Sequence, residues 1–291
     1  PCQGAIVAEA YLSNVRAIEI LNTINSKELV ADCYNEKKEG FKYGAGCIQK
    51  FGVTTITTKN GKYVYAGGKD SEGTEFVKWN PLPDLTINGK LFSTTEEMKE
   101  FFDYEWNDET IKFDKPVVFV ANYKAIQGQT ALKSLKDKTI IASGTKTWFE
   151  LSKKGYWVTA SADALGFEFL LPSLNMPLFK IQASDILILT HGSAAVRWRM
   201  RGYNAVSNYK LVPKKDRTIQ ESIAKAEAIF WTSFSQYEFY GKYAKPGVKH
   251  LCGGGETAEL LKKAGMVPIV FPTIKAFEQW RKYSIQSRSV A

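Results

Sequence analysis

Five short turns of this 291-residue chain combine glycine with hydroxyl or amide side chains. Glycine lets backbone amides come close to a ligand, a hydroxyl adds a hydrogen-bond donor, and the N-terminus of a following helix favours an anion. The turns lie at residues 121–123, 143–147, 190–193, 232–235 and 252–257, and include Asn122, Gly144, Gly192 and Gly254 as candidate ligand-binding residues. Doubly wound folds need small residues at such turns in any case, but five together indicate an anion-binding cleft.

Runs of apolar residues before these turns predict the strands that position them. The candidate strands are 117–120, 139–142, 186–189, 228–231, 248–252 and 267–270. Continuous apolar strands that alternate with amphipathic helices are typical of parallel sheets covered on both faces. The later part of the chain therefore predicts two short doubly wound α/β domains, in which ligands collect at the carboxyl ends of the strands.

Residues 1–83 have a different pattern. Apolar residues at helical spacing predict two helices within 10–41, and Ser26 is placed to cap the second helix. Alternating residues around an Asn60-Gly61 turn predict a β-hairpin, and a third strand is expected near 75–79. These elements predict a small α+β domain with a three-stranded antiparallel sheet. Two prolines in the segment 80–84 make it a natural linker.

Several other chemistries are not supported. Glycines 253–255 lack the spacing and the acidic partner of a dinucleotide-binding turn. The four cysteines form no CxxC pair and only two histidines are present, so no metal site is predicted, and reduced thiols in a cytoplasmic protein are the default. Neither His191 nor His250 belongs to a Ser-His-Asp or Cys-His set. No run of eighteen apolar residues exists, so no membrane span is expected.

The net charge of +9 is concentrated in the later part of the chain. Residues 1–83 carry 10 Lys and Arg against 9 Asp and Glu, and the remainder carries 29 against 21. Such a surface suits an acidic partner, namely a nucleic acid, a membrane or a polycarboxylate, but it also suits simple solubility. The most basic cluster could bind substrate carboxylates or form a solvated face, and consists of Arg197, Arg199, Arg201, Lys210, Lys214 and Lys215.

Four motifs between residues 228 and 280 follow one another in a specific order. They are Phe230-Trp231-Thr232-Ser233, Gly254-Gly255-Glu256-Thr257-Ala258, Gly265-Met266-Val267-Pro268 and Pro272-Thr273-Ile274. This order resembles the C-terminal part of uroporphyrinogen-III synthases. Gly144-Thr145-Lys146-Thr147 followed by Gly155 repeats the turn–helix–glycine spacing in the other half, and the resemblance extends over roughly residues 86–283.

The resemblance implies two linked flavodoxin-like α/β lobes with the active site between them. Residues 84–111 and 212–291 would form one lobe, and residues 112–211 would be the inserted second lobe. Residues 86–111 are short for the first strand, helix and crossover of the family, so one of these elements is expected to be missing or supplied by another part of a full chain.

The family's site consists mainly of backbone amides and hydroxyls, which implies substrate-binding roles for Thr147, Ser233 and Thr257. The family also has one tyrosine in a strand near the second crossover, a position that Tyr209 occupies here. Its substrate, hydroxymethylbilane, carries eight carboxylates, loses a hydroxyl group and closes with its last ring inverted. Such catalysis depends largely on geometry and needs no cofactor. Tyr209 would act as a general acid, or would simply pack against the strand.

Two motifs in the first region resemble the C-terminal domain of hydroxymethylbilane synthase, also called porphobilinogen deaminase. They are Gln3-Gly4-Ala5-Ile6 and Gly44-Ala45-Gly46-Cys47. By this resemblance, Cys47 would carry the dipyrromethane cofactor through a thioether, unless it is an unmodified loop thiol. The deaminase's catalytic domains have no counterpart in this sequence. We therefore expect a piece of a longer bifunctional fusion, which would also explain a start at Pro1 rather than Met.

The leading hypothesis is thus a lyase of tetrapyrrole (haem) biosynthesis that cyclises hydroxymethylbilane with inversion of the last pyrrole ring and loss of water. One alternative is the C-terminal fragment of a hydroxymethylbilane synthase. Another is a non-catalytic module that binds anions or nucleic acid, although nucleic acid is not favoured. Binding to nucleic acid would show a steep salt dependence, because it releases counterions from phosphates.

Overall fold

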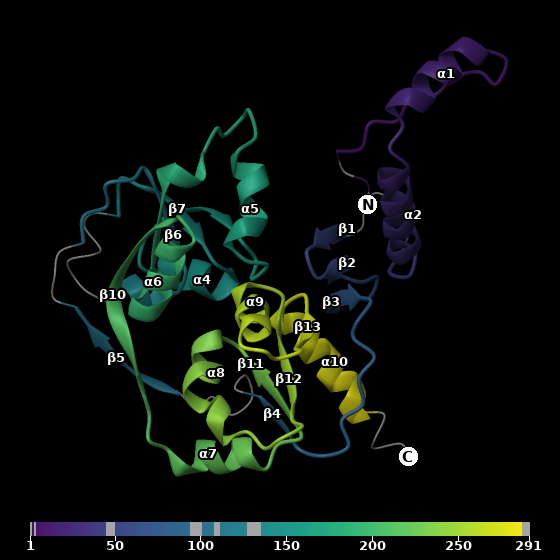
Figure 1. Cartoon of the computed structure of the whole chain (residues 1–291). Helices are drawn as coiled ribbons and strands as arrows, with labels where there is room; N and C mark the ends of the chain where they lie inside the picture. Colours follow the sequence, from purple (N-terminus) through teal and green to yellow (C-terminus); the bar gives the residue numbers. More distant parts are fainter. Residues whose placement is uncertain are drawn as a thin grey trace. The chain divides into compact units, whose positions relative to one another are not determined.

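The computed structural model describes residues 2, 4–44, 50–93, 101–107, 111–126 and 135–286. The chain forms two compact units, which can be followed in Figure 1. The first consists of Pro1–Asp84 with Lys275–Ala291, and the second of Leu85–Ile274. Among the described residues, no helix is both long enough and apolar enough to cross a membrane.

The first unit contains a three-stranded antiparallel sheet. Helices α1 (Val15–Ile24) and α2 (Lys27–Gly40) precede strands β1 (Phe51–Thr58), β2 (Gly61–Lys69) and β3 (Glu75–Asn80), which pair in the order β1-β2-β3. The Ser26 hydroxyl accepts a hydrogen bond from the Leu29 amide at 3.2 Å, so its predicted role as the N-cap of α2 is confirmed. The pairing of Thr58 with Gly61 confirms the predicted hairpin.

The terminal helix α10 (Ile274–Gln286) belongs to the first unit from Lys275 onward and contacts β3 through Gln279. The Gln279 side chain accepts a hydrogen bond from the Trp79 amide at 2.8 Å and donates one to the Trp79 carbonyl at 3.2 Å. Both backbone groups of an edge-strand residue are thereby satisfied. The predicted domain division, in which 275–291 belongs with 84–111 and 212–274, stays a prediction.

A six-stranded sheet forms one lobe of the second unit. Its order is β5 (Phe102–Trp106), β10 (Asn204–Pro213), β9 (Ile186–His191), β6 (Val117–Val120), β7 (Thr139–Ala142) and β8 (Val158–Ser161). Only β5 is antiparallel to its neighbour. The helices of this lobe are η1 (Tyr123–Ile126), α4 (Thr145–Lys153), α5 (Phe167–Leu174), η2 (Ala183–Asp185) and α6 (Gly192–Met200). We call it the six-stranded lobe.

The four-stranded lobe has an entirely parallel sheet. Its order is β13 (Ile269–Phe271), β12 (Lys249–Gly253), β11 (Ala228–Trp231) and β4 (Leu91–Ser93), with helices α7 (Arg217–Ala224), α8 (Phe234–Tyr240), η3 (Gly241–Tyr243) and α9 (Glu256–Lys263). Strands β5 and β10 run between the lobes (Figure 1). The Tyr240 hydroxyl fixes both connections to α8, because it donates to the Phe101 and Lys214 carbonyls at 2.6 and 2.9 Å.

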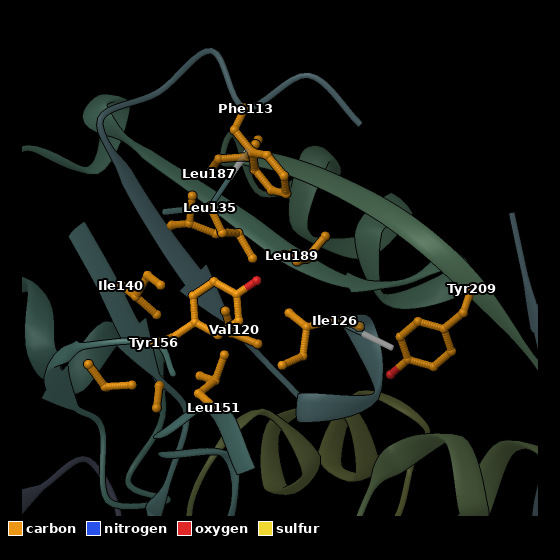
Figure 2. Packing of buried hydrophobic residues seen from close by; sticks show 14 residues of the cluster. Phe113, Val120, Ile126, Leu135, Ile140, Leu151, Tyr156, Leu187, Leu189 and Tyr209 are labelled. Atoms are coloured by element: carbon orange, nitrogen blue, oxygen red, sulfur yellow. The ribbon is translucent and has the colours of Figure 1, made fainter. Parts of the chain in front are cut away.

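Apolar side chains cover both faces of the six-stranded sheet. Val118 and Val120 of β6 pack in a cluster with Leu151 of α4, while Val117 and Phe119 pack with residues of α5 and α6. Figure 2 shows the first of these clusters. The predicted fold class, a small α+β domain followed by two linked flavodoxin-like parallel α/β lobes, is confirmed. Within the predicted segment 84–111, however, β4 joins the four-stranded sheet and β5 joins the six-stranded one.

Candidate functional site

The predicted residues of the six-stranded lobe lie where its parallel strands end. Asn122 is exposed directly after β6, and its Oδ1 accepts a hydrogen bond from the Lys124 amide at 2.9 Å. Gly144 is the N-cap of α4, with no side chain to satisfy the first amides of that helix. Gly192 is the first residue of α6, directly after β9. All three positions leave backbone amides at the carboxyl edge of the sheet.

Thr147, by contrast, points into the protein. It is 6% exposed, and its Oγ1 lies 3.3 Å from Oγ of Ser143. Ser143 Oγ in turn donates to the Ala121 carbonyl at 2.7 Å. These two hydroxyls therefore join the turns that follow β6 and β7. Thr147 is placed to support the turn rather than to present a hydroxyl outside it.

The predicted residues of the four-stranded lobe lie at the start of two helices. Ser233 is the N-cap of α8, but its side chain makes no capping hydrogen bond. Gly254 lies in the turn before α9, and Thr257 lies in the first turn of that helix. The hydroxyls of Ser233 and Thr257 belong to half-buried residues. This lobe thus presents two helix N-termini at the carboxyl ends of β11 and β12.

Two glycines bring the turns of the lobes together. A Cβ atom built on Gly166, directly before α5, would lie 3.7 Å from Cα of Gly255, the N-cap of α9. A Cβ built on Gly144 would lie 3.4 Å from the Ala164 amide nitrogen. The segment 162–166 therefore connects the Gly144 turn of one lobe with the Gly254 turn of the other.

Segment 162–166 was not identified from the sequence. Its signal is weak, because Gly166 is its only glycine. The backbone nevertheless has positive φ at Asp163 (46°), Ala164 (64°) and Gly166 (104°). Non-glycine residues rarely adopt this conformation, and where they do they often belong to a functional turn.

The predicted basic cluster is largely engaged within the protein. Arg201 contacts Glu168 of its own lobe and lies 3.6 Å from Glu256 and 3.7 Å from Glu259 on α9. Arg197 lies 3.9 Å from Glu238 of α8. Arg199 donates to a backbone carbonyl, that of Ala205, at 2.9 Å, and Lys214 lies 3.2 Å from Asp103. These cations mainly join elements to one another, and two of the arginines join the lobes.

Tyr209 lies in β10 at one end of the cluster shown in Figure 2. It is 2% exposed, and its ring centroid is 5.9 Å from that of His191 and 6.0 Å from that of Tyr104. No hydrogen bond of its hydroxyl occurs within the described residues. Burial, and then the neighbouring Tyr104 and Tyr123, raise the pKa of Tyr209 well above its usual range. The group is therefore a neutral proton donor at physiological pH.

His191 is the neighbour of Tyr209 on β9. Its Nδ1 lies 3.2 Å from Oγ of Ser193, in the first turn of α6. Burial, and then the positive charge of Arg197, lower the pKa of His191 from 6.5 to about 4. The imidazole is therefore neutral near pH 7 and able to exchange hydrogen-bond roles with a hydroxyl. Sequence reasoning found no catalytic set around this histidine and missed its contact with Tyr209.

A second feature missed from the sequence lies beside Tyr209. Lys124 Nζ is 4.3 Å from the ring centroid of Tyr104 and 5.6 Å from that of Tyr123. Lys146 Nζ is 5.5 Å from the same Tyr123 centroid. Two of these side chains come from turns that the sequence did identify, 121–123 and 143–147. Their convergence depends on the pairing of β6 with β7.

Cys47, the predicted attachment point for dipyrromethane, lies outside the described residues. The described cysteines are Cys2 and Cys33, both half-buried, and the buried Cys252. In the part of the chain that the structure describes, no three His, Cys, Asp or Glu side chains gather as a metal site would require.

Comparisons with known proteins identify similar solved structures only. No protein-family model matches the chain, and neither does any curated protein sequence. A mutant uroporphyrinogen III synthase from the extremely thermophilic bacterium Thermus thermophilus is 18% identical, with a TM-score of 0.37 over 60% of this chain and 79% of that one. The wild-type enzyme from the same bacterium is 20% identical, with a TM-score of 0.32 over 61% of this chain and 80% of that one.

Proposed function

We propose that this chain is a uroporphyrinogen-III synthase, a lyase that cyclises hydroxymethylbilane with inversion of the last pyrrole ring and loss of water. The ordered motifs from Phe230 to Ile274 support this proposal. The observation that carries it is the arrangement around Tyr209. A buried neutral phenol lies in the strand that connects two lobes, whose small-residue turns meet at Gly166 and Gly255.

The turns would bind the flexible polycarboxylate and hold it in the geometry that closes the ring. Backbone amides at the N-termini of α4, α8 and α9 suit carboxylates, because these amides have no partner within their helix. The helices belong to both lobes, so one extended anion could engage both. Positioning of this kind contributes rate without strong acids or bases.

Tyr209 would donate its proton to the hydroxyl of the terminal hydroxymethyl group, which leaves as water. The azafulvene that remains is attacked by the substituted carbon of the last ring, and the resulting spiro intermediate reopens with that ring inverted. The proton lost when the macrocycle closes returns to the tyrosinate. The ring centroid of His191 lies 5.9 Å from that of Tyr209, and the imidazole is neutral. It would therefore place no positive charge beside the Tyr209 hydroxyl.

The test is the isomer that the protein produces. Hydroxymethylbilane closes spontaneously to the symmetric I isomer, so the chain is incubated with it and the oxidised products are separated by chromatography. We expect the III isomer in excess over a protein-free control. Production of the I isomer alone, by a chain that is shown to be folded, would overturn the proposed function.

We also propose that the first unit derives from the C-terminal domain of a hydroxymethylbilane synthase, in a longer cytoplasmic parent chain. Its helices and three-stranded antiparallel sheet support this assignment. Cys47 would carry dipyrromethane there, and the missing upstream domains would be its partners. Intact mass spectrometry of that parent is the test. A parent mass without the dipyrromethane increment, or an increment that is retained after Cys47→Ala, would contradict the role of Cys47.

A nucleic-acid-binding module finds less support. The arginines that suggested it contact Glu168, Glu238, Glu256, Glu259 and a backbone carbonyl. Their charge is therefore largely compensated within the protein. A weak dependence of any nucleic-acid binding on salt is the expected result.

A further inference from the structure

An aromatic and basic cluster extends from Tyr209 along the carboxyl edge of the six-stranded sheet. Tyr209 neighbours Tyr104, Lys124 lies over Tyr104 at 4.3 Å, and both Lys124 and Lys146 lie near the Tyr123 ring. We call these five residues the tyrosine–lysine cluster. Its members come from β10, β5, η1 and α4, so only the folded lobe brings them together.

Lys146 keeps its positive charge uncompensated by any ion pair within the described residues. The acidic side chain of its own helix, Glu150, forms its ion pair with Lys153 at 2.9 Å, and Lys146 acts on it only as one of the weaker charges that lower the Glu150 pKa. A tyrosine ring attracts an ammonium group without neutralising it. Tyr123 thus positions Lys146 while leaving the charge able to bind an anion. Lys146 also directly follows Thr145, the first residue of α4, where helix amides favour the same sign of ligand.

Lys124 supplies a second ammonium group on the same ring. Each Nζ lies within 5.6 Å of the Tyr123 centroid, so the two ammonium groups are at most about 11 Å apart, a separation that two flexible carboxylate arms of one small ring can span. A pyrrole of hydroxymethylbilane carries two carboxylates on adjacent carbons. Its two acidic arms match the two ammonium groups beside Tyr123 in number and in charge.

We propose that Lys124 and Lys146 bind the two carboxylates of one pyrrole ring of the substrate beside Tyr123, an inference that rests on the proposed function. Because the cluster continues through Tyr104 to Tyr209, this contact orients the bound tetrapyrrole relative to the Tyr209 hydroxyl. The two lysines are therefore substrate-positioning residues.

The binding test uses uroporphyrin III, a stable and fluorescent octacarboxylate, with Lys124→Gln, Lys146→Gln and the double variant. Loss of one charge-assisted contact should weaken binding about tenfold, and Lys146→Arg should restore most of it. Lys153→Gln is the matched control on the same helix and should bind as the wild type does. Equal affinity of wild type and double variant, or no binding by the wild type, would overturn the inference.

The isomer assay separates this inference from the proposed function. If the wild type forms the III isomer, the two lysine variants should raise KM about tenfold with little change in kcat, because they remove binding shared by ground and transition states. Unchanged KM would overturn the role of the lysines while leaving the function in place. A wild type that binds uroporphyrin III through these lysines but forms no III isomer would overturn the function alone.

Discussion

At the scale of single residues, Tyr209 combines a core position with a chemically useful group. Its ring packs with those of Tyr104 and His191, so the hydroxyl could be removed without disturbing the packing. Its pKa is raised by burial above the usual value of 10. The protonated form is thus present at every pH at which the enzyme would work, and ionisation of Tyr209 should not limit activity below about pH 10.

Tyr209→Phe should lower kcat for the III isomer by about a hundredfold or more, since it removes the proposed general acid. KM and the free energy of unfolding should change little. Tyr240→Phe is the control, because its hydroxyl only joins the Phe101 and Lys214 carbonyls to α8. That variant should lose about 1 kcal/mol of stability and keep its kcat. Equal kcat values for the Tyr209→Phe variant and the wild type would exclude the acid role.

The lowered pKa of His191 predicts how the stability of the protein depends on pH. Burial and Arg197 lower its pKa to about 4 in the folded protein, whereas an unfolded chain protonates near 6.5. The stabilisation is therefore complete above about pH 6.5 and is lost as the pH falls through about 4. Between about pH 7 and pH 4.5 the wild type should lose about 2 kcal/mol more than His191→Asn. Urea unfolding at several pH values measures the difference, and parallel curves for the two proteins would refute it.

At the scale of elements, the β1–β2 hairpin depends on a glycine that the alternating pattern does not reveal. Gly68 has a φ of +146°, and a Cβ there would lie 2.2 Å from the Lys50 carbonyl oxygen and 2.5 Å from Cα of Phe51. Both atoms belong to the backbone and cannot turn aside. This position therefore excludes any side chain, for reasons of space as well as conformation.

Gly68→Ala should destabilise the first unit by about 3 kcal/mol, as the sum of a positive-φ penalty and overpacking. Gly73→Ala separates the two effects, because Gly73 also has positive φ, +81°, but nothing within 4 Å of its missing Cβ. It should cost about 1 kcal/mol. Denaturant unfolding of both variants measures the difference, and equal losses would mean that the close approach of β1 to Gly68 is relieved by a backbone shift.

At the scale of the whole molecule, the two lobes of the second unit are joined by ion pairs as well as by the close approach of two glycines. Arg201 extends from the end of α6 to two carboxylates of α9, next to the place where Gly166 meets Gly255. Its guanidinium also lies 4.6 Å from the Trp198 ring centroid, which holds it on its own lobe. The same side chain thus joins the end of α6 to the first turn of α9, which is proposed to bind substrate.

Arg201→Gln should loosen this contact without unfolding either lobe. Amide hydrogen exchange should become faster in residues 162–166 and 253–257, since local opening governs exchange there. Arg217→Gln, an exposed position at the start of α7, is the control. If both variants exchange as the wild type does, Arg201 does not hold the lobes together. High salt should partly reproduce the effect in the wild type, because ion pairs that are not fully buried are screened.

Local sequence determined most elements of this protein. Strands β6, β7 and β11 were predicted to the residue, because three or four consecutive apolar side chains need burial on both faces. Ser26 and the Asn60-Gly61 pair act on their nearest neighbours, so their roles were readable as well. The small-residue turns follow for the same reason. At all these positions the interactions between residues close in sequence are sufficient to predict the local structure.

Tertiary structure decided the rest. Strands β5 and β10 carry polar and charged residues. Within the described residues, strand β5 pairs only with β10, about a hundred positions away in the sequence, and β10 also pairs with β9. The partners of Arg201, the environment of Tyr209 and the convergence of Lys124 with Lys146 arise in the same way. The sequence alone predicted which turns combine small residues with hydroxyl or amide side chains. Which side chains face those turns depends on long-range pairing and burial, and neither leaves a local pattern in the chain.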